Sequence, residues 1–254
     1  MIPSMGLLQV ALLALLVAAY YRRIVRLVGE PMARRALAVI LERSPSANMW
    51  SRADMDGVSR LVLAGIMQLI FVSFLVILFP IHWSELLPGH LNPILLLLGV
   101  ILGIAEAALG SQLAFLAFRL ADTVQRNKQP MSMEAWLTVA RGGWMRYYVR
   151  TAAVAPRPLL VGVTALYVVG EELVFRGVVL GATAPRIGAG FAGCLSVVLF
   201  LLAQVSYTPG WRTALFPLVG ALVVGVVHAY LYTIVPEIAP LMVAHVTMFL
   251  VAVL

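Results

Sequence analysis

The chain has 254 residues, of which 62% are hydrophobic and 11% are charged, and its mean hydropathy is +0.99. These values are typical of polytopic membrane proteins and exclude an ordinary soluble globular domain. The single cysteine, Cys194, excludes an intrachain disulfide and a metal site built from cysteines. The net charge is +7. In so apolar a chain, the basic residues indicate membrane topology and contact with lipid headgroups, and we expect no binding of nucleic acid.

The N-terminal part of the chain alternates apolar runs with basic segments. Apolar runs of about 20 residues predict membrane spans, which we place over about 5–21, 60–81 and 93–118. Residues 22–60 and 119–157 hold fifteen of the 18 basic residues. We expect amphipathic helices there that lie along the membrane surface. If the segment 22–58 enters the membrane, it adds an eighth span.

The C-terminal part of the chain is almost continuously apolar. We predict four spans there, over about 158–181, 187–206, 212–234 and 239–254. The expected fold is therefore all-α, a polytopic transmembrane helical bundle of about seven spans. We divide it into an N-terminal part, residues 1–157, and a core, residues 158–254. The positive-inside rule places both basic segments and the C-terminus in the cytoplasm. The single cysteine and the abundance of Arg, Ala and Leu favour a bacterial inner membrane.

The most informative motif is a pair of adjacent carboxylates, Glu171 and Glu172, inside an apolar predicted span. Charges in hydrocarbon are costly and usually have a partner or a function. Glu172 and Arg176 are four residues apart on one helix face, so they can form an ion pair. Glu171 is rotated by about 100° from Glu172 and has no basic partner in its own helix. It is a candidate general base; the alternative is a purely structural ion pair that ties helices together.

Few other polar side chains interrupt the predicted spans. They are Glu106, Gln112, Gln204, His228 and His245. Taken singly, each is most simply explained as a hydrogen-bond partner between membrane helices. Taken in chain order after the glutamate pair, some of them form a more specific pattern.

The run Glu171-Glu172-x-x-x-Arg176 resembles the first motif of the CAAX protease and bacteriocin-processing (CPBP or Abi) family of intramembrane proteases. The resemblance covers about 158–254. It implies that Glu171 activates a water molecule for attack on a peptide carbonyl, and that Glu172 and Arg176 form a structural pair.

The second and third motifs of that family are altered in this chain. The family's Phe-x-x-x-His would be Phe200-x-x-x-Gln204, with glutamine in place of the histidine. Its His-x-x-x-Asn or His-x-x-x-Asp would be His245-x-x-x-Phe249, with phenylalanine in the last position. Gln204 can hold a water molecule or an oxyanion but cannot carry a proton near neutral pH. Phe249 offers no hydrogen-bond donor.

The resemblance leaves His245 as a polar partner of the catalytic Glu171, and His228 on a neighbouring span could turn into the gap. Because one imidazole and one amide or carboxylate are missing from the family's set, we expect no metal site. No other cofactor is indicated.

We therefore predict an intramembrane endopeptidase with an altered and weakened site, acting on a peptide or a lipidated peptide. One alternative is a non-catalytic relative that binds such a peptide or a membrane protein partner. The other is a structural subunit of a larger membrane complex. Retention of Glu171 favours catalysis, because a buried unpaired carboxylate is unfavourable unless it is used. The two substitutions favour the non-catalytic relative.

Overall fold

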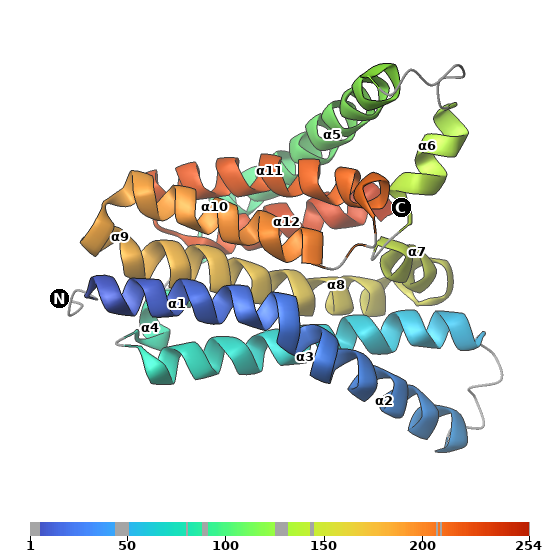
Figure 1. Cartoon of the computed structure of the whole chain (residues 1–254), viewed down its shortest axis with the longest axis horizontal. Helices are drawn as coiled ribbons and strands as arrows, with labels where there is room; N and C mark the ends of the chain where they lie inside the picture. The colour runs from blue at the N-terminus through green and yellow to red at the C-terminus, as the bar shows by residue number, and fades with distance from the viewer. Residues whose placement is uncertain are drawn as a thin grey trace.

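The computed structural model describes residues 6–43, 51–79, 81–87, 91–124, 132–142, 145–206, 208 and 210–253. Within these ranges the chain is overwhelmingly helical and contains no strand, which confirms the predicted all-α fold. The helices form an elongated bundle (Figure 1). Parts of both basic segments, residues 44–50, 125–131 and 143–144, lie outside the described residues.

The N-terminal helices are α1 (Leu7–Ala19), the π-helix η1 (Tyr20–Gly29), α2 (Glu30–Arg43), α3 (Arg52–Leu78), α4 (Trp83–Leu86), α5 (Pro93–Val124), α6 (Met133–Ala140) and α7 (Met145–Val154). The first apolar helix is longer than predicted and runs over Leu7–Ala33. Arg22, Arg23 and Arg26 are exposed on the outside of η1. Basic residues on an outer helix face do not end the helix, so the helix continues past residue 21.

The C-terminal helices are α8 (Arg157–Glu172), the π-helix η3 (Leu173–Gly181), α9 (Ala182–Ile187), α10 (Ala189–Ser206), α11 (Trp211–Ile234) and α12 (Ile238–Val253). In the described part of the chain, six helices are long and apolar enough to cross a membrane, and α12 is a shorter apolar helix at the seventh predicted span. Leu8, Ile77 and Phe191 are each more than three-quarters exposed on the outside. Such apolar outer surfaces are expected where helices face lipid tails.

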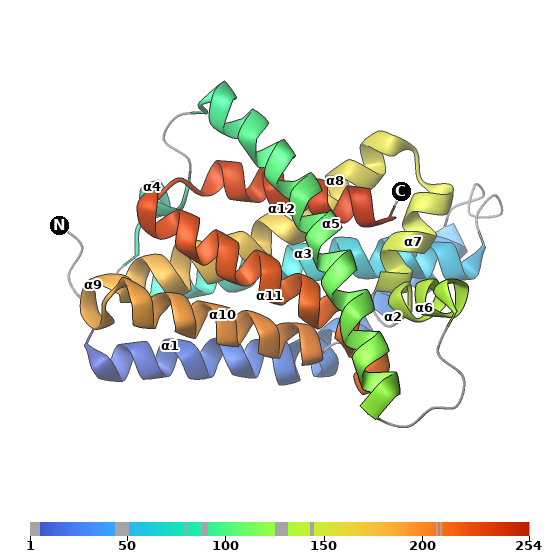
Figure 2. The same ribbon diagram turned by 90° about the horizontal axis from the view of Figure 1, so that it is seen from above.

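The long helix α5 crosses α11 and α12 obliquely (Figure 2). Glycines make the close crossing with α12 possible. A Cβ atom on Gly99 would press against the backbone oxygen of Pro240, and one on Gly103 against that of Ala244. Small residues at such crossings let membrane helices approach closely. The crossing brings Glu106, one turn beyond Gly103, next to the helices that carry the two buried histidines.

The two ends of the bundle differ in charge. The start of α1, α4 and α9 lie at one end, whereas the far end of α2, the start of α3, α6, α7 and the end of α12 lie at the other (Figures 1 and 2). The later part of the first basic segment, in α2 and the start of α3, therefore lies at the same end as α6 and α7 of the second basic segment. This arrangement agrees with the distribution of basic residues that the positive-inside rule expects.

Candidate active site

The glutamate pair stands where α8 continues into the π-helix η3, and both side chains are fully buried. Stretches of π-helix inside longer helices are frequent at functional sites. Arg176, within η3, places its Nη1 atom 3.2 Å from Glu172 Oε1. The two residues that the spacing predicted to pair are thus in contact, and neither side chain has appreciable access to solvent.

Arg176 is held by two further helices. Its Nη2 atom donates a hydrogen bond of 3.0 Å to the backbone oxygen of Val224 in α11. Its guanidinium carbon lies 4.8 Å from the centre of the Phe200 ring in α10, which is within range of a cation–π interaction. Arg176 therefore ties η3 to α10 and α11 as well as to Glu172.

Glu172 is the centre of a polar cluster and not merely the partner of Arg176. Its Oε1 atom lies 3.1 Å from Nδ1 of His228 in α11 and 2.6 Å from Nδ1 of His245 in α12. The two imidazole rings are nearly perpendicular, with centres 5.8 Å apart. His228, which the sequence left as a possible occupant of the gap beside Glu171, contacts Glu172 in the structure.

Glu171 points to a different set of partners. Gln204 Nε2 donates a hydrogen bond of 3.1 Å to Glu171 Oε1, and Tyr167, one turn earlier in α8, also forms a side-chain hydrogen bond with Glu171. The Oε2 atom has no hydrogen-bond partner among the described residues. His245 Nε2 lies 3.9 Å from this oxygen. The structure thus brings together the three residues that the altered family pattern singled out, Glu171, Gln204 and His245.

Glu106 in α5 is part of the cluster, although nothing in the sequence assigned it a role beyond helix packing. Its side chain is buried, and Oε1 lies 3.2 Å from Nε2 of His228. The only signal for it was an acidic residue isolated in a long apolar span. Gln112, on the same helix, is exposed and lies outside the cluster.

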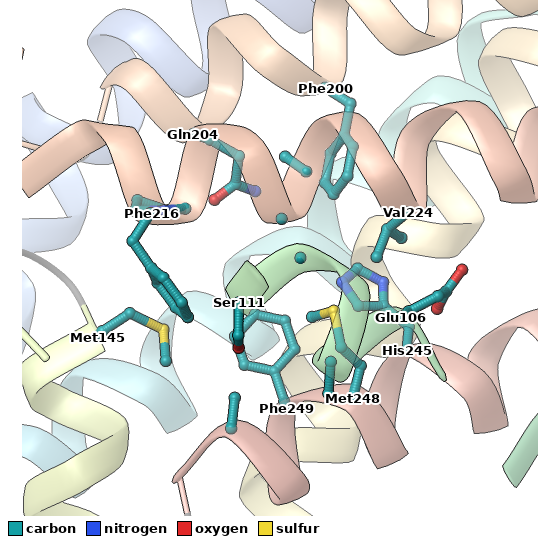
Figure 3. A pocket seen from close by; sticks show the side chains of 16 residues that line it. Glu106, Ser111, Met145, Phe200, Gln204, Phe216, Val224, His245, Met248 and Phe249 are labelled. Carbon is teal, nitrogen blue, oxygen red and sulfur yellow. The ribbon is translucent and has the colours of Figure 1, made fainter. Parts of the chain in front are cut away.

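A small cavity that opens to the outside lies beside the cluster. Gln204 and Phe200 approach it from α10, and His245 and Phe249 from α12 (Figure 3). Gln204 and His245 are also the side chains next to the two oxygens of Glu171. The cavity therefore reaches the immediate partners of Glu171.

Phe249 closes one wall of the cavity with an aromatic ring. The ring lies 5.3 Å from that of His245 and is stacked on Tyr148 in α7 at 5.0 Å. The altered third motif thus places packed hydrocarbon beside His245, where the family pattern has a polar side chain.

Glu172, His228 and His245 also have the spacing of a metal site. Each offers one ligand atom, and these atoms lie within 4.8 Å of one another. The sequence-based expectation of no metal considered the altered motif positions and did not include His228 as a partner of Glu172.

Comparisons with known proteins agree with the resemblance in the motifs. Residues 153–251 match the family model described as Type II CAAX prenyl endopeptidase Rce1-like, which confirms the predicted CPBP resemblance. No curated protein and no solved structure matches the chain. The apolar helices and the family match together indicate a multi-pass membrane protein. The family match also supports a function of the CAAX-type intramembrane protease kind.

Proposed function

We propose that the chain is an intramembrane endopeptidase in which Glu171 activates the water that attacks a peptide bond. The observation that carries this proposal is the asymmetry of the Glu171 carboxylate. Gln204 holds Oε1, whereas Oε2 has no hydrogen-bond partner in the described part of the chain and lies 3.9 Å from His245 Nε2. An oriented carboxylate with one oxygen that lacks a hydrogen bond, and whose neighbours Gln204 and His245 line a cavity, supports the role of a general base.

In the proposed reaction, Glu171 takes a proton from a water molecule as the water oxygen bonds to the peptide carbonyl carbon. Gln204 and His245 line the cavity, and an amide N–H or imidazole N–H there can donate to the developing oxyanion. Collapse of the intermediate breaks the carbon–nitrogen bond, and the proton held by Glu171 goes to the departing amine. The Glu172–Arg176 pair positions Glu171 and does not touch the substrate.

The proposed substrate is a peptide that carries an isoprenoid group near its carboxyl end, as the name of the matching family suggests. The cavity wall supports this choice, because several apolar side chains line it beside the polar ones: Met145, Phe216, Met248 and Phe249. Such a wall can accept an apolar chain, while Gln204 and His245 remain available to the peptide.

A cleavage assay on the protein in liposomes tests the proposal. The probe is a peptide ending in the Cys-aliphatic-aliphatic-X pattern with a farnesyl group on its cysteine, alongside the same peptide without the lipid. Glu171→Gln should abolish cleavage, because the amide keeps the shape of the side chain and removes the base. Glu237→Gln, the same change at an exposed site between α11 and α12, should have no effect. Cleavage that persists in Glu171→Gln would exclude Glu171 as the base.

The packing of Phe249 supports one alternative, a non-catalytic protein that binds the same class of peptide. Phe249 is buried against Tyr148 and His245. It stands where the family pattern has a polar side chain, so the site lacks that polar group. In that case neither the native protein nor Glu171→Gln cleaves the probe, but the farnesylated peptide still binds, and binding can be followed by fluorescence of a labelled probe.

We also propose a bacterial inner membrane, with the basic end of the bundle and the C-terminus in the cytoplasm and in contact with anionic lipids. The concentration of arginine at that end supports this orientation. Labelling of single cysteines placed in α4 and α7 tests it, because the two should react from opposite sides of the membrane.

The division of the chain between residues 157 and 158 stays a prediction. Helices pack across this boundary, α3 on α8 and α5 on α12. Binding of a membrane protein partner is likewise only proposed.

A further inference from the structure

A second cavity lies at the end of the bundle that holds α4 and α9 (Figures 1 and 2). Its volume is about 350 Å³, which is within the range of small-molecule sites. Residues of α4, η3, α9 and α11 form its walls. Among the described residues, none lines both this cavity and the cavity beside the polar cluster. The second cavity is therefore a separate place in the fold, and the proposed reaction makes no use of it.

Two glycines of η3 form the inner wall of this second cavity. A Cβ atom on Gly177 would lie 2.8 Å from Cδ2 of Leu86 in α4. One on Gly181 would lie 3.3 Å from the hydroxyl oxygen of Tyr232 in α11. Because η3 has no side chain at these two positions, α4 and α11 can pack closely against it. The walls of the cavity are thus held by packing contacts.

Glu85 is the one charged side chain among the described residues that line the second cavity. Its Oε2 atom accepts a hydrogen bond of 3.3 Å from the backbone N–H of His82, which fixes the side chain on α4. It also lies near enough to Tyr232 for its charge to act on the tyrosine hydroxyl. Arg186 is exposed and follows the lining residue Pro185, but it does not line the cavity itself. A carboxylate beside a hydroxyl group suits an ammonium group, which carries positive charge and only donates hydrogen bonds.

The position of the second cavity favours a lipid as the source of that ammonium group. The cavity lies where α9 turns into α10 and where α11 ends. Membrane spans end near the lipid headgroups. Three apolar side chains, each one or two residues from a lining residue, are more than half exposed: Leu87, Phe191 and Ile234. A lipid whose headgroup enters the cavity can therefore lay its acyl chains against an apolar outer surface.

We propose that the second cavity binds a phospholipid whose headgroup ends in an ammonium group, with Glu85 as the partner of that group. The negative charge selects the headgroup, and the surrounding apolar side chains accept the acyl chains. This inference does not rest on the proposed proteolysis, because the binding of a lipid can be measured in protein that has no activity.

Native mass spectrometry of the full-length protein in detergent tests the proposal. The probe is dioctanoyl phosphatidylethanolamine, and the comparison is dioctanoyl phosphatidylglycerol, which has the same acyl chains and no ammonium group. Glu85→Gln should weaken binding of the first lipid about three- to tenfold, between the values of an exposed ion pair and of a desolvated charged hydrogen bond. It should leave the second lipid unaffected. Unchanged affinity for the ethanolamine lipid, or an equal loss for both lipids, would overturn the proposal.

A matched control separates the cavity from the general charge of this end of the bundle. Glu237→Gln makes the same change at an exposed residue that follows the lining residue Pro236 and lies outside the cavity. It should bind the ethanolamine lipid as the native protein does, and an effect as large as that of Glu85→Gln would refute the site. Glu85→Gln itself should fold, because glutamine can also accept the capping hydrogen bond from His82.

A second variant tests the cavity without changing any charge. Ala184, in α9, lines the cavity, so Ala184→Phe should fill part of it and weaken binding of the ethanolamine lipid. Native affinity in this variant would place the lipid elsewhere and overturn the proposal. Free ethanolamine should compete poorly, because it lacks acyl chains. Displacement of the lipid by ethanolamine at equal concentration would assign the site to a soluble amine and refute the lipid.

The proposed function and the lipid site can fail independently. Glu171→Gln should bind the ethanolamine lipid with native affinity and lose only cleavage. Cleavage that persists in Glu171→Gln would contradict the proposed function and leave the lipid site standing. Loss of lipid binding in Glu171→Gln would instead show that the lipid occupies the cavity beside the polar cluster, which would overturn the present proposal.

Discussion

Glu172 and Arg176 form a buried ion pair, 3.2 Å from Oε1 to Nη1, whose two members differ in their other partners. Glu172 also contacts His228 and His245. Arg176 has the Val224 carbonyl oxygen and the face of Phe200. Neither of these is an anion, so loss of Glu172 leaves the guanidinium with the poorer set of partners.

We therefore predict unequal effects of the two single replacements. Breaking a buried pair costs about 3–5 kcal/mol in the free energy of unfolding. The loss in Glu172→Gln should lie at the upper end of this range. The loss in Arg176→Met should lie at the lower end, because the two histidines can still balance the negative charge of Glu172. The double variant should be less destabilised than the sum of the two. Unfolding in mixed micelles measures all three, and strict additivity in this double-mutant cycle would mean that the pair is not coupled.

The second prediction concerns Gln204, which donates to Glu171 but cannot carry a proton. If the native protein cleaves the probe, Gln204→His should raise the rate about 10²- to 10⁴-fold, the range for a positioned acid–base group. The same change at the exposed Gln112 is the control and should leave the rate unchanged. An equal increase in both variants would show that the effect does not come from the site.

Spacing along one helix could be interpreted from the sequence, whereas convergence between helices could not. The four-residue interval between Glu172 and Arg176 predicted their contact because helix geometry alone sets it. Glu106 and His228 lie on α5 and α11, far apart in the chain, and only the crossing of these helices brings them within 3.2 Å. No local pattern contains that information.

The span boundaries illustrate a second limit. Hydropathy located the apolar helices, because a membrane span needs a minimum length of apolar residues. It did not show that the helix of the first predicted span continues without a break past Arg22 and Arg23. In the structure these residues lie on the exposed side of a helix that continues to Ala33. A window average does not record which face of a helix carries the charge.

The third prediction is that Phe249→Asn alone lowers stability. The Phe249 ring is 5% exposed and stacked on Tyr148, so a smaller polar side chain leaves a cavity and an unsatisfied amide. Large-to-small changes of a buried phenylalanine cost about 3–5 kcal/mol. Thermal unfolding in detergent should show a clear fall in Tm. Phe191→Asn, at a ring that is 77% exposed, is the control in micelles.

The expected loss of stability in Phe249→Asn affects how the family's cleavage activity can be restored. Restoring the family pattern at Phe249 introduces a hydrogen-bond donor but removes the packing that holds His245. We expect the combination of Gln204→His with Phe249→Asn to be faster per folded molecule than Gln204→His alone, and less stable. A combined variant as stable as the native protein would show that Phe249 is not needed to position α12.

The fourth prediction tests whether the crossing of α5 and α12 positions the site. A Cβ atom on Gly103 would lie within 3.0 Å of several atoms of Ala244 and Thr247, so Gly103→Ala must push the helices apart. Overpacking of this kind costs about 1–3 kcal/mol. Gly162→Ala is the matched control, because nothing lies within 4 Å of a Cβ atom there. Since alanine is the better helix former by about 0.5–1 kcal/mol, this control should be neutral or slightly stabilising.

Because Ala244 precedes His245, the displacement in Gly103→Ala should also reach the polar cluster. His245 Nδ1 lies 2.6 Å from Glu172, and a shift of α12 by a fraction of an ångström lengthens this contact. We therefore expect Gly103→Ala to lower both Tm and any cleavage of the farnesylated probe, while Gly162→Ala lowers neither. A Gly103→Ala protein with reduced Tm but unchanged cleavage would show that the site tolerates movement of α12. Opposite signs of the Tm change in the two variants would identify the glycine crossing, and not helix propensity, as the cause.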